Sequence, residues 1–234
     1  MRKNAKTIRL SIIMPIYNEA ATVEQAIRRV LARKEAVEVI VVNDGSTDET
    51  GRILQRLSKT LNNLKLLIHQ RNQGKGAAIR TGLTAVTGNY VLIHDADLEY
   101  DPSDIKALLA PIREGKATVV FGSRFRGSHS NMFFWHYLGN SLLNLLINVF
   151  YDTTLSDMET CYKLIPTDLV RSFSLKERGF GIEPELTSKI LKKGYLIYEV
   201  PISYAGRTYA EGKKLNWTEG IRALGIILRE RLTG

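Results

Sequence analysis

The stretch Leu10–Glu19, with the sequence LSIIMPIYNE, joins an almost purely apolar run to a polar end. Similar apolar runs follow along the first half of the chain, at Val37–Val42, Lys65–His69, Tyr90–His94 and Thr118–Phe121. Continuous apolar runs of this length are typical of strands buried on both faces of a parallel sheet. The amphipathic segments between them begin with capping-box spacing, at Thr22 with Gln25 and at Ser46 with Glu49. This alternation predicts an α/β fold of the doubly wound type, with a mostly parallel sheet flanked by helices.

Polar residues come directly after four of these runs. They are Tyr17-Asn18-Glu19, Asn43-Asp44-Gly45-Ser46, Asp95-Ala96-Asp97 and Gly122-Ser123-Arg124. Ligands of open α/β sheets bind outside the carboxyl ends of the strands. We therefore expect a binding site at this edge, built from acids, amides and a guanidinium.

The sequence Asp95-Ala96-Asp97 places two carboxylates one residue apart at the end of a predicted buried strand. Carboxylate oxygens are ligands that Mg²⁺ and Mn²⁺ accept, usually together with substrate phosphates. Glu99 is a possible third ligand. A bare pair of this kind is also common in solvated turns, but its place at a strand end favours a metal that neutralises a diphosphate.

Other residues at this edge suit a nucleotide. Asp44 lies at a turn where a carboxylate can accept hydrogen bonds from a base or ribose. The segment Pro15–Glu19 offers the aromatic face of Tyr17 for stacking, while Asn18 is equally well explained as a helix cap. Gln73–Gly76 matches neither the phosphate-loop nor the dinucleotide-binding pattern, yet its glycines permit a close backbone approach and Lys75 is available for phosphate.

The second half of the chain has a different pattern. Within Asn131–Tyr151, three asparagines recur every fourth residue, at 140, 144 and 148, and apolar residues fill the rest. This stripe disfavours a membrane-spanning helix and leaves two alternatives, a buried core helix and a helix lying in the membrane interface. Further elements are expected as a helix at Glu183–Lys193, a strand at Tyr195–Tyr204 and an amphipathic C-terminal helix at Trp217–Leu232. The basic loop between the last two is either solvated or a phosphate-binding segment.

Composition excludes several classes of protein. The 234 residues carry 33 Lys and Arg against 24 Asp and Glu, a formal net charge of +9, which points to a polyanionic partner. A nucleic acid is disfavoured, because the basic residues are spread along the chain without a recognised motif. The single cysteine, Cys161, excludes an intramolecular disulfide framework. The basic start at residues 1–6 indicates a cytoplasmic protein rather than a secretory signal.

Together these motifs resemble the family 2 glycosyltransferases of the GT-A fold, and most closely the dolichol-phosphate mannose synthase branch, which includes polyprenyl-phosphate glycosyltransferases. The matching segments are Pro15–Glu19, Asn43–Ser46, Asn72–Gly76, Asp95–Asp97, Gly122–Arg124, Asp157–Lys163, Gly181–Leu186 and Val200–Tyr204. The chain is read as one domain, residues 1–234, with a nucleotide-sugar half at about 8–125 and an acceptor-side half at about 126–234. One departure is Asn43, where the family often has Asp.

The resemblance implies a role for each matching residue. The residues that would bind the base and ribose are Pro15, Tyr17, Glu19, Val42 and Asp44. The metal would be bound by Asp97 and Glu99. The phosphates of donor or acceptor would be contacted by Arg124, Arg207 and Lys213. Asn18, Lys75, Asp95 and Ala96 complete the predicted substrate site, and Asp95, Asp97 and Arg124 are the expected catalytic residues.

The same resemblance implies an activity. A metal-dependent, inverting hexosyltransferase would move mannose or glucose from GDP-mannose or UDP-glucose to a polyprenyl or dolichyl phosphate, with Mg²⁺ or Mn²⁺. Such an enzyme is expected to be peripheral on the cytoplasmic membrane face. The alternative is a family 2 enzyme acting on a soluble sugar or protein hydroxyl, which would need Asp157 or Glu159 as a base.

Overall fold

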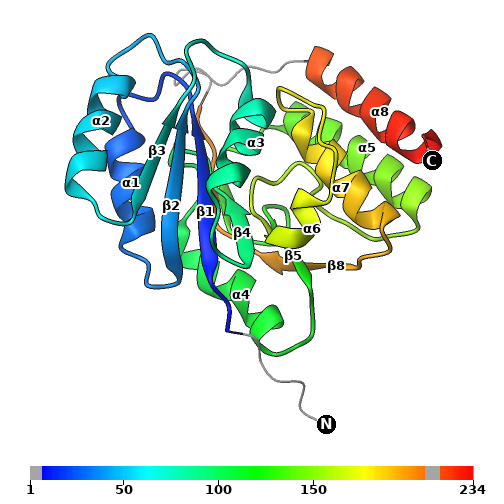
Figure 1. Cartoon of the computed structure of the whole chain (residues 1–234). Helices are drawn as coiled ribbons and strands as arrows, with labels where there is room; N and C mark the ends of the chain where they lie inside the picture. The colour runs from blue at the N-terminus through cyan, green and yellow to red at the C-terminus, as the bar shows by residue number, and fades with distance from the viewer. Residues whose placement is uncertain (1–6, 209–216, 234) are drawn as a thin grey trace.

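The computed structural model describes residues 7–208 and 217–233. Within them, a seven-stranded sheet has the order β3-β2-β1-β4-β7-β5-β8 (Figure 1). Its strands are β1 (Leu10–Ile16), β2 (Ala36–Asn43), β3 (Leu64–Ile68), β4 (Tyr90–Ile93), β5 (Val119–Ser123), β7 (Lys163–Pro166) and β8 (Ile197–Pro201). All neighbours pair in parallel except β7, which runs antiparallel to β4 and β5. The predicted mostly parallel sheet is confirmed.

Helices flank the sheet in two groups. Those of the first half and centre are α1 (Val23–Leu31), α2 (Thr50–Thr60), α3 (Lys75–Ala85), η1 (Pro102–Asp104) and α4 (Ile105–Arg113). Those of the second half are α5 (Phe134–Tyr151), α6 (Thr167–Arg171), α7 (Ile182–Lys192) and α8 (Trp217–Leu232). Helix α3 packs on β1 and β2, while α5, α7 and α8 pack against one another beyond the other end of the sheet (Figure 1).

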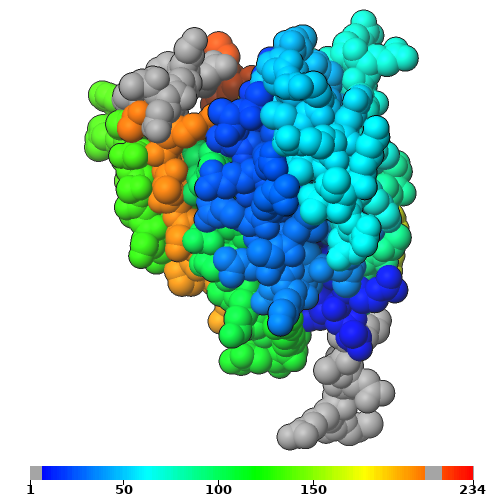
Figure 2. Space-filling model, turned by 90° about the vertical axis from the view of Figure 1, so that its left-hand side faces the viewer, coloured from blue at the N-terminus to red at the C-terminus, as the bar shows by residue number. Residues whose placement is uncertain are grey.

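Two local predictions were wrong. The predicted strand Tyr195–Tyr204 is divided into β8 and β9 (Tyr204–Ala205), because the backbone N–H of Ser203 donates to Asp104 Oδ2 at 2.7 Å instead of continuing a ladder. Strand β9 pairs in parallel with β6 (His129–Ser130). In Figure 2 the part of the chain that holds β8 and β9, coloured orange, lies between the green and blue parts.

The capping boxes also differ from the prediction. Thr22 precedes α1 but donates its hydroxyl to the Glu19 carboxylate instead of capping the helix, and α2 begins at Thr50, four residues after Ser46. Ser46 Oγ accepts the backbone N–H of Asn18 at 3.0 Å. Ser46 therefore joins the turn after β2 to the turn after β1.

One side of helix α5 is buried, as the core-helix alternative predicts, and its other side is exposed. Two of its asparagines turn inward: Asn144 Nδ2 donates to Ser156 O at 2.6 Å and its Oδ1 accepts from Met158 N at 2.8 Å, while Asn148 makes a similar pair of bonds with Leu155. Asn140 instead donates to His136 O of its own helix at 2.8 Å. On the same helix Leu143 and Ile147 pack in a small core with Met158, Ala223 and Ile227. The outer side of α5 exposes large apolar residues to solvent. No helix among the described residues is both long and apolar enough to span a membrane.

Candidate active site

A cleft of about 300 Å³ opens at the carboxyl ends of β1, β2 and β4, and we call it the carboxyl-edge cleft. It is lined by Pro15, Ile16, Tyr17, Glu19, Asp44, Asn72, Gly74, Lys75, Ala78, Asp95, Ala96, Asp97, Gly179, Phe180 and Arg207. Most of the residues predicted to bind the sugar nucleotide thus meet at one place, although they come from segments as far apart in the sequence as Pro15 and Arg207. Gly179 and Phe180 enter this cleft from the loop before α7, which the motifs of the first half do not reveal.

Asp44 anchors one wall of the cleft. Its Oδ1 lies 2.6 Å from His69 Nδ1 and accepts the N–H of Gln73 at 2.9 Å, and its Oδ2 accepts the N–H of Gly74 at 2.7 Å. A carboxylate has about four acceptor positions, so one remains for a base or ribose. Gly74 has a φ of +97°, and a Cβ there would lie 2.5 Å from Arg178 O, so only glycine fits this turn.

Asp95 is fixed by a chain of buried ion pairs. Lys75 Nζ lies 2.9 Å from Asp95 Oδ2 and 3.2 Å from Glu183 Oε1, and Lys163 Nζ lies 2.5 Å from Glu183 Oε2. Burial opposes ionisation of Asp95, but the charge and hydrogen bond of Lys75, together with Cys161 and His94, outweigh it and lower the pKa of this carboxyl. Burial likewise works against the charge of Lys75, and Asp95 and Glu183 raise its pKa well above the ordinary value. Lys75 therefore holds a fixed positive charge in the cleft.

Asp97 is the carboxylate best suited to a metal. Burial, together with the negative charges of Asp95 and Glu99, raises the pKa of Asp97 to about 7. Its Oδ2 lies 3.3 Å from Arg207 Nη2, whose guanidinium also approaches Glu99 at 3.4 Å and Glu19 at 3.7 Å. A divalent cation would relieve the repulsion between Asp97 and the carboxylates of Asp95 and Glu99, so the environment of Asp97 fits a cation.

Glu99 was predicted as a second metal ligand, and its carboxylate is otherwise engaged. Tyr204 donates its hydroxyl to Glu99 Oε2 at 2.6 Å, and Arg207 donates its backbone N–H to Oε1 at 2.9 Å. Among residues 7–208 and 217–233, no three His, Cys, Asp or Glu side chains gather as a metal site. Diphosphate oxygens and water would then supply most of the coordination, as they commonly do for Mg²⁺.

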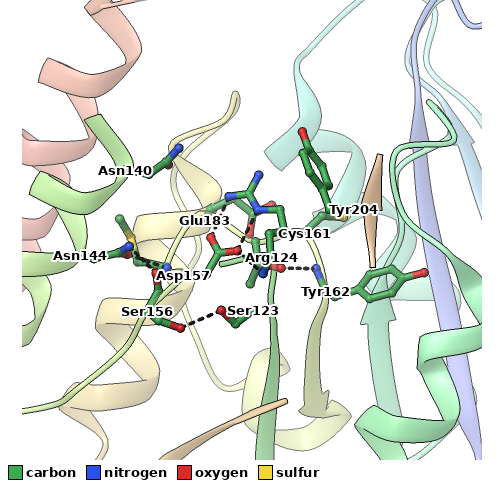
Figure 3. A network of polar contacts seen from close by, with 12 residues as sticks. Ser123, Arg124, Asn140, Asn144, Ser156, Asp157, Cys161, Tyr162, Glu183 and Tyr204 are labelled. Carbon is green, nitrogen blue, oxygen red and sulfur yellow. Dashed lines mark hydrogen bonds and ion pairs between the residues drawn. The ribbon is translucent and has the colours of Figure 1, made fainter. Parts of the chain in front are cut away.

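Arg124 does not line the carboxyl-edge cleft; its guanidinium lies 5.3 Å from the centre of the Tyr204 ring and is paired with Asp157. Its Nε and Nη2 donate to the Asp157 carboxylate at 2.8 and 2.7 Å, and its backbone N–H donates at 2.9 Å (Figure 3). Asp157 is fully buried, and Ser123 and Ser156 share a hydrogen bond of 2.7 Å next to the pair. The pair uses two of the five guanidinium N–H groups, so three remain to meet a phosphate.

Two of the three remaining predicted residues lie elsewhere. Val42 is fully buried in β2, with its side chain in the core. Asn18 has a φ of 54° and accepts the N–H of Thr47 at 2.8 Å, so it holds the turn after β1 and does not line the cleft. Lys213 lies outside the described residues.

Glu159 lies in a different environment from Asp157. Its Oε1 is buried without a hydrogen-bond partner in the described part of the chain. Burial raises the pKa of Glu159 to about 7, against the opposing charge of Lys163. Of the two carboxylates predicted as possible bases, Glu159 is therefore the one whose oxygen is free to accept a proton.

Comparison with known proteins places the chain among sugar-transferring enzymes. The low-salt glycan biosynthesis hexosyltransferase Agl6 of Haloferax volcanii is 30% identical over 94% of this chain and 53% of its own length. Glycosyltransferase GlyA of Streptococcus pneumoniae is also 30% identical, over 96% of this chain and 34% of its own length. The chain thus spans about half of the first relative and about a third of the second.

Solved structures show the same fold. Glucosyl-3-phosphoglycerate synthase from Mycobacterium tuberculosis, in complex with Mn²⁺, UDP and phosphoglyceric acid, superposes with a TM-score of 0.76 at 18% identity, over 97% of this chain and 80% of that one. The predicted GT-A fold is therefore confirmed. The glycosyl transferase family 2 model matches residues 11–173, which is more than half of the sequence. By its sequence, the chain belongs to glycosyl transferase family 2.

Proposed function

We propose that the protein is a metal-dependent inverting hexosyltransferase that moves mannose or glucose from GDP-mannose or UDP-glucose to a polyprenyl or dolichyl phosphate at the cytoplasmic membrane face. The observation that supports a lipid acceptor is the exposed apolar surface on the outer side of α5. Its side chains Phe134, Trp135, Leu142, Leu145 and Val149 are between 54% and 69% exposed. A contiguous apolar surface of this kind is typical of a lipid or protein contact, and the net charge of +9 favours an anionic membrane.

The donor would lie in the carboxyl-edge cleft. Asp44 and Tyr17 would hold the nucleoside, and Mg²⁺ or Mn²⁺ at Asp97 would supply charge neutralisation for the departing diphosphate. Lys75 is held in place by Asp95 and Glu183, so it presents its positive charge without reorganisation. Arg207 lies against Asp97 and adds a second positive charge on the same side.

The acceptor would approach beside Arg124. A lipid phosphate is largely ionised near neutral pH, because its second pKa lies at about 6, and it attacks without a protein base. The new bond joins a phosphate oxygen to the anomeric carbon, while the bond from that carbon to the nucleotide phosphate breaks and its electron pair leaves with the diphosphate. A single displacement inverts the configuration, so an α-linked donor gives a β-linked product.

Acceptor competition tests this function. Purified protein with Mg²⁺ is given a labelled nucleotide sugar together with polyprenyl phosphate, polyprenol and a soluble glycan. We expect the label to pass to polyprenyl phosphate and not to polyprenol, because only the phosphate is ionised. Transfer to polyprenol or to the glycan, with the lipid phosphate unlabelled, would contradict the proposal.

Membrane binding is expected to depend on the outer side of α5. Replacing Leu145 and Val149 by glutamate places two negative charges there, and binding to anionic vesicles should fall at least about tenfold, because apolar burial is lost and repulsion is added. Vesicle sedimentation measures this effect. The matched control replaces Val37 and Ile68, which are exposed apolar residues of β2 and β3, by glutamate. Equal vesicle binding by the two double variants would contradict the prediction.

A second candidate function is transfer to a hydroxyl acceptor, and the unpartnered Oε1 of Glu159 favours it. This carboxylate would take the proton of the acceptor hydroxyl as the oxygen attacks the anomeric carbon. Glu159→Gln should then lower kcat by about 100-fold or more, and the acid limb of the pH profile should disappear. With a lipid phosphate as acceptor, the same variant should stay within about threefold of the wild type, since no base is needed.

A further inference from the structure

A second and larger cavity lies between α5 and α8, and we call it the α5–α8 groove. Its volume is about 470 Å³, within the roughly 300–1,000 Å³ of small-ligand sites. Its walls are mainly apolar and include Leu142, Leu143 and Leu146 of α5 with Ile221 and Leu224 of α8. An apolar cavity of this size attracts an apolar molecule, and the carboxyl-edge cleft does not account for it.

The α5–α8 groove adjoins the carboxyl-edge cleft. The ring of Phe180 lines both cavities and lies 5.8 Å from Lys75 Nζ. The loop that carries Phe180 is tied to α8, since Arg222 and Arg229 pair with Glu177 at 2.8 and 2.9 Å. It is also tied to α3, where the backbone N–H of Ala77 donates to Arg178 O at 3.1 Å. A molecule in the groove therefore lies next to the cleft that would hold the donor.

The charged residues in and around the groove favour one orientation of a bound molecule that has an anionic end and an apolar end. Its acidic residues are Glu159 and Glu219, and both disfavour an anionic group. The positive charges of Lys75 and Arg124 lie outside it, Lys75 in the neighbouring cleft and Arg124 at its pair with Asp157. A molecule with one anionic end and one apolar end would thus place its apolar end between α5 and α8.

We propose that the α5–α8 groove binds the isoprenoid chain of the acceptor, with the phosphate turned past Phe180 toward the donor. This inference rests on the proposed function and adds to it a binding site whose size makes acceptor affinity depend on the length of the isoprenoid chain. Each buried methylene group strengthens binding roughly fourfold. Acceptor affinity should therefore rise steeply over the first isoprene units and then level off once the groove is filled.

Two glycines of the groove have open space where a side chain would begin. Gly139 of α5 and Gly220 of α8 line it, and a Cβ at either position would meet no atom within 4 Å. Gly225 of α8 also has open space around its Cβ but does not line the groove. The matched variants are thus Gly139→Phe and Gly220→Phe, with Gly225→Phe as the control.

The test measures KM and the calorimetric Kd for dimethylallyl, farnesyl and undecaprenyl phosphate. In the wild type and in Gly225→Phe, farnesyl phosphate should bind at least about tenfold more tightly than dimethylallyl phosphate. In Gly139→Phe and Gly220→Phe this advantage should be lost, while the KM for the nucleotide sugar stays unchanged.

The outcomes separate the groove from the proposed function. Lipid phosphates accepted equally well at every chain length, or a chain-length advantage that survives in Gly139→Phe and Gly220→Phe, would overturn the groove and leave the function standing. Chain-dependent binding that these variants abolish, with the sugar passing to a hydroxyl instead, would support the groove and overturn the function. Failure of the wild type to bind any of the three phosphates would overturn both.

Discussion

Replacing Asp97 by asparagine is expected to lower kcat by about 100- to 1,000-fold while the protein stays folded. The variant keeps the shape of the side chain but removes the charge that would hold the metal, and loss of one electrostatic contact to a developing anion has an effect of this size. Initial rates at saturating nucleotide sugar measure the change. Affinity for Mn²⁺, followed by electron paramagnetic resonance, should fall with it.

The same variant is expected to be more stable than the wild type above neutral pH. The pKa of Asp97 is raised from 3.8 to about 7 in the folded protein, so the folded state holds its proton more tightly than the unfolded chain. Stability therefore falls as pH rises through this window, and the full penalty is present above about pH 7. Asparagine removes that penalty, which is on the order of 2–4 kcal/mol.

Urea unfolding at about pH 5 and pH 8 separates the two effects. Asp101→Asn is the control, because Asp101 caps η1 through a bond from Ser103 N that asparagine can also accept. Full activity in Asp97→Asn, or a variant less stable than the wild type at the higher pH, would contradict the role given to Asp97.

Replacing Asp157 by alanine is expected to destabilise the protein by about 3–5 kcal/mol, because it leaves the buried Arg124 guanidinium without its counter-charge. Asp157 accepts three N–H groups of Arg124, at 2.7 to 2.9 Å, and is itself fully buried. Chemical denaturation measures the loss. If Asp157 served mainly as a solvated base, the loss would stay within about 1 kcal/mol.

A double variant checks the cause. Arg124→Met combined with Asp157→Leu removes both charges and keeps apolar volume, so it should be more stable than Asp157→Ala alone. Its activity should nevertheless be low if Arg124 meets a phosphate. A double variant as unstable as Asp157→Ala would show that packing, and not an unpaired charge, explains the loss.

The first half of the molecule was predictable because its strands β1, β2 and β4 are mostly buried on both faces. Their apolar runs stand out, and the polar residues after them converge at one edge by the geometry of parallel sheets. Asp44, Asp95 and Asp97 could therefore be placed in one cleft from the sequence alone.

Contacts distant in sequence were not predictable in the same way. Nothing local shows that Arg124 pairs with a carboxylate 33 residues away, that Tyr204 occupies Glu99, or that Phe180 separates two cavities. In α5 the period of the asparagines was evident, but the direction in which they face depends on the loop that carries Ser156 and Met158. Each of these features requires tertiary packing, which periodicity does not encode.

The most direct test of the proposed activity is the ³¹P NMR spectrum of the lipid product. A lipid phosphate is a monoester whose signal shifts as its second proton titrates at a pKa of about 6. Transfer of the sugar to that phosphate makes a diester, so the product signal should not move between about pH 5 and pH 8, and the anomeric proton should show the β configuration. A lipid signal that still titrates while the sugar appears on a hydroxyl would contradict the account.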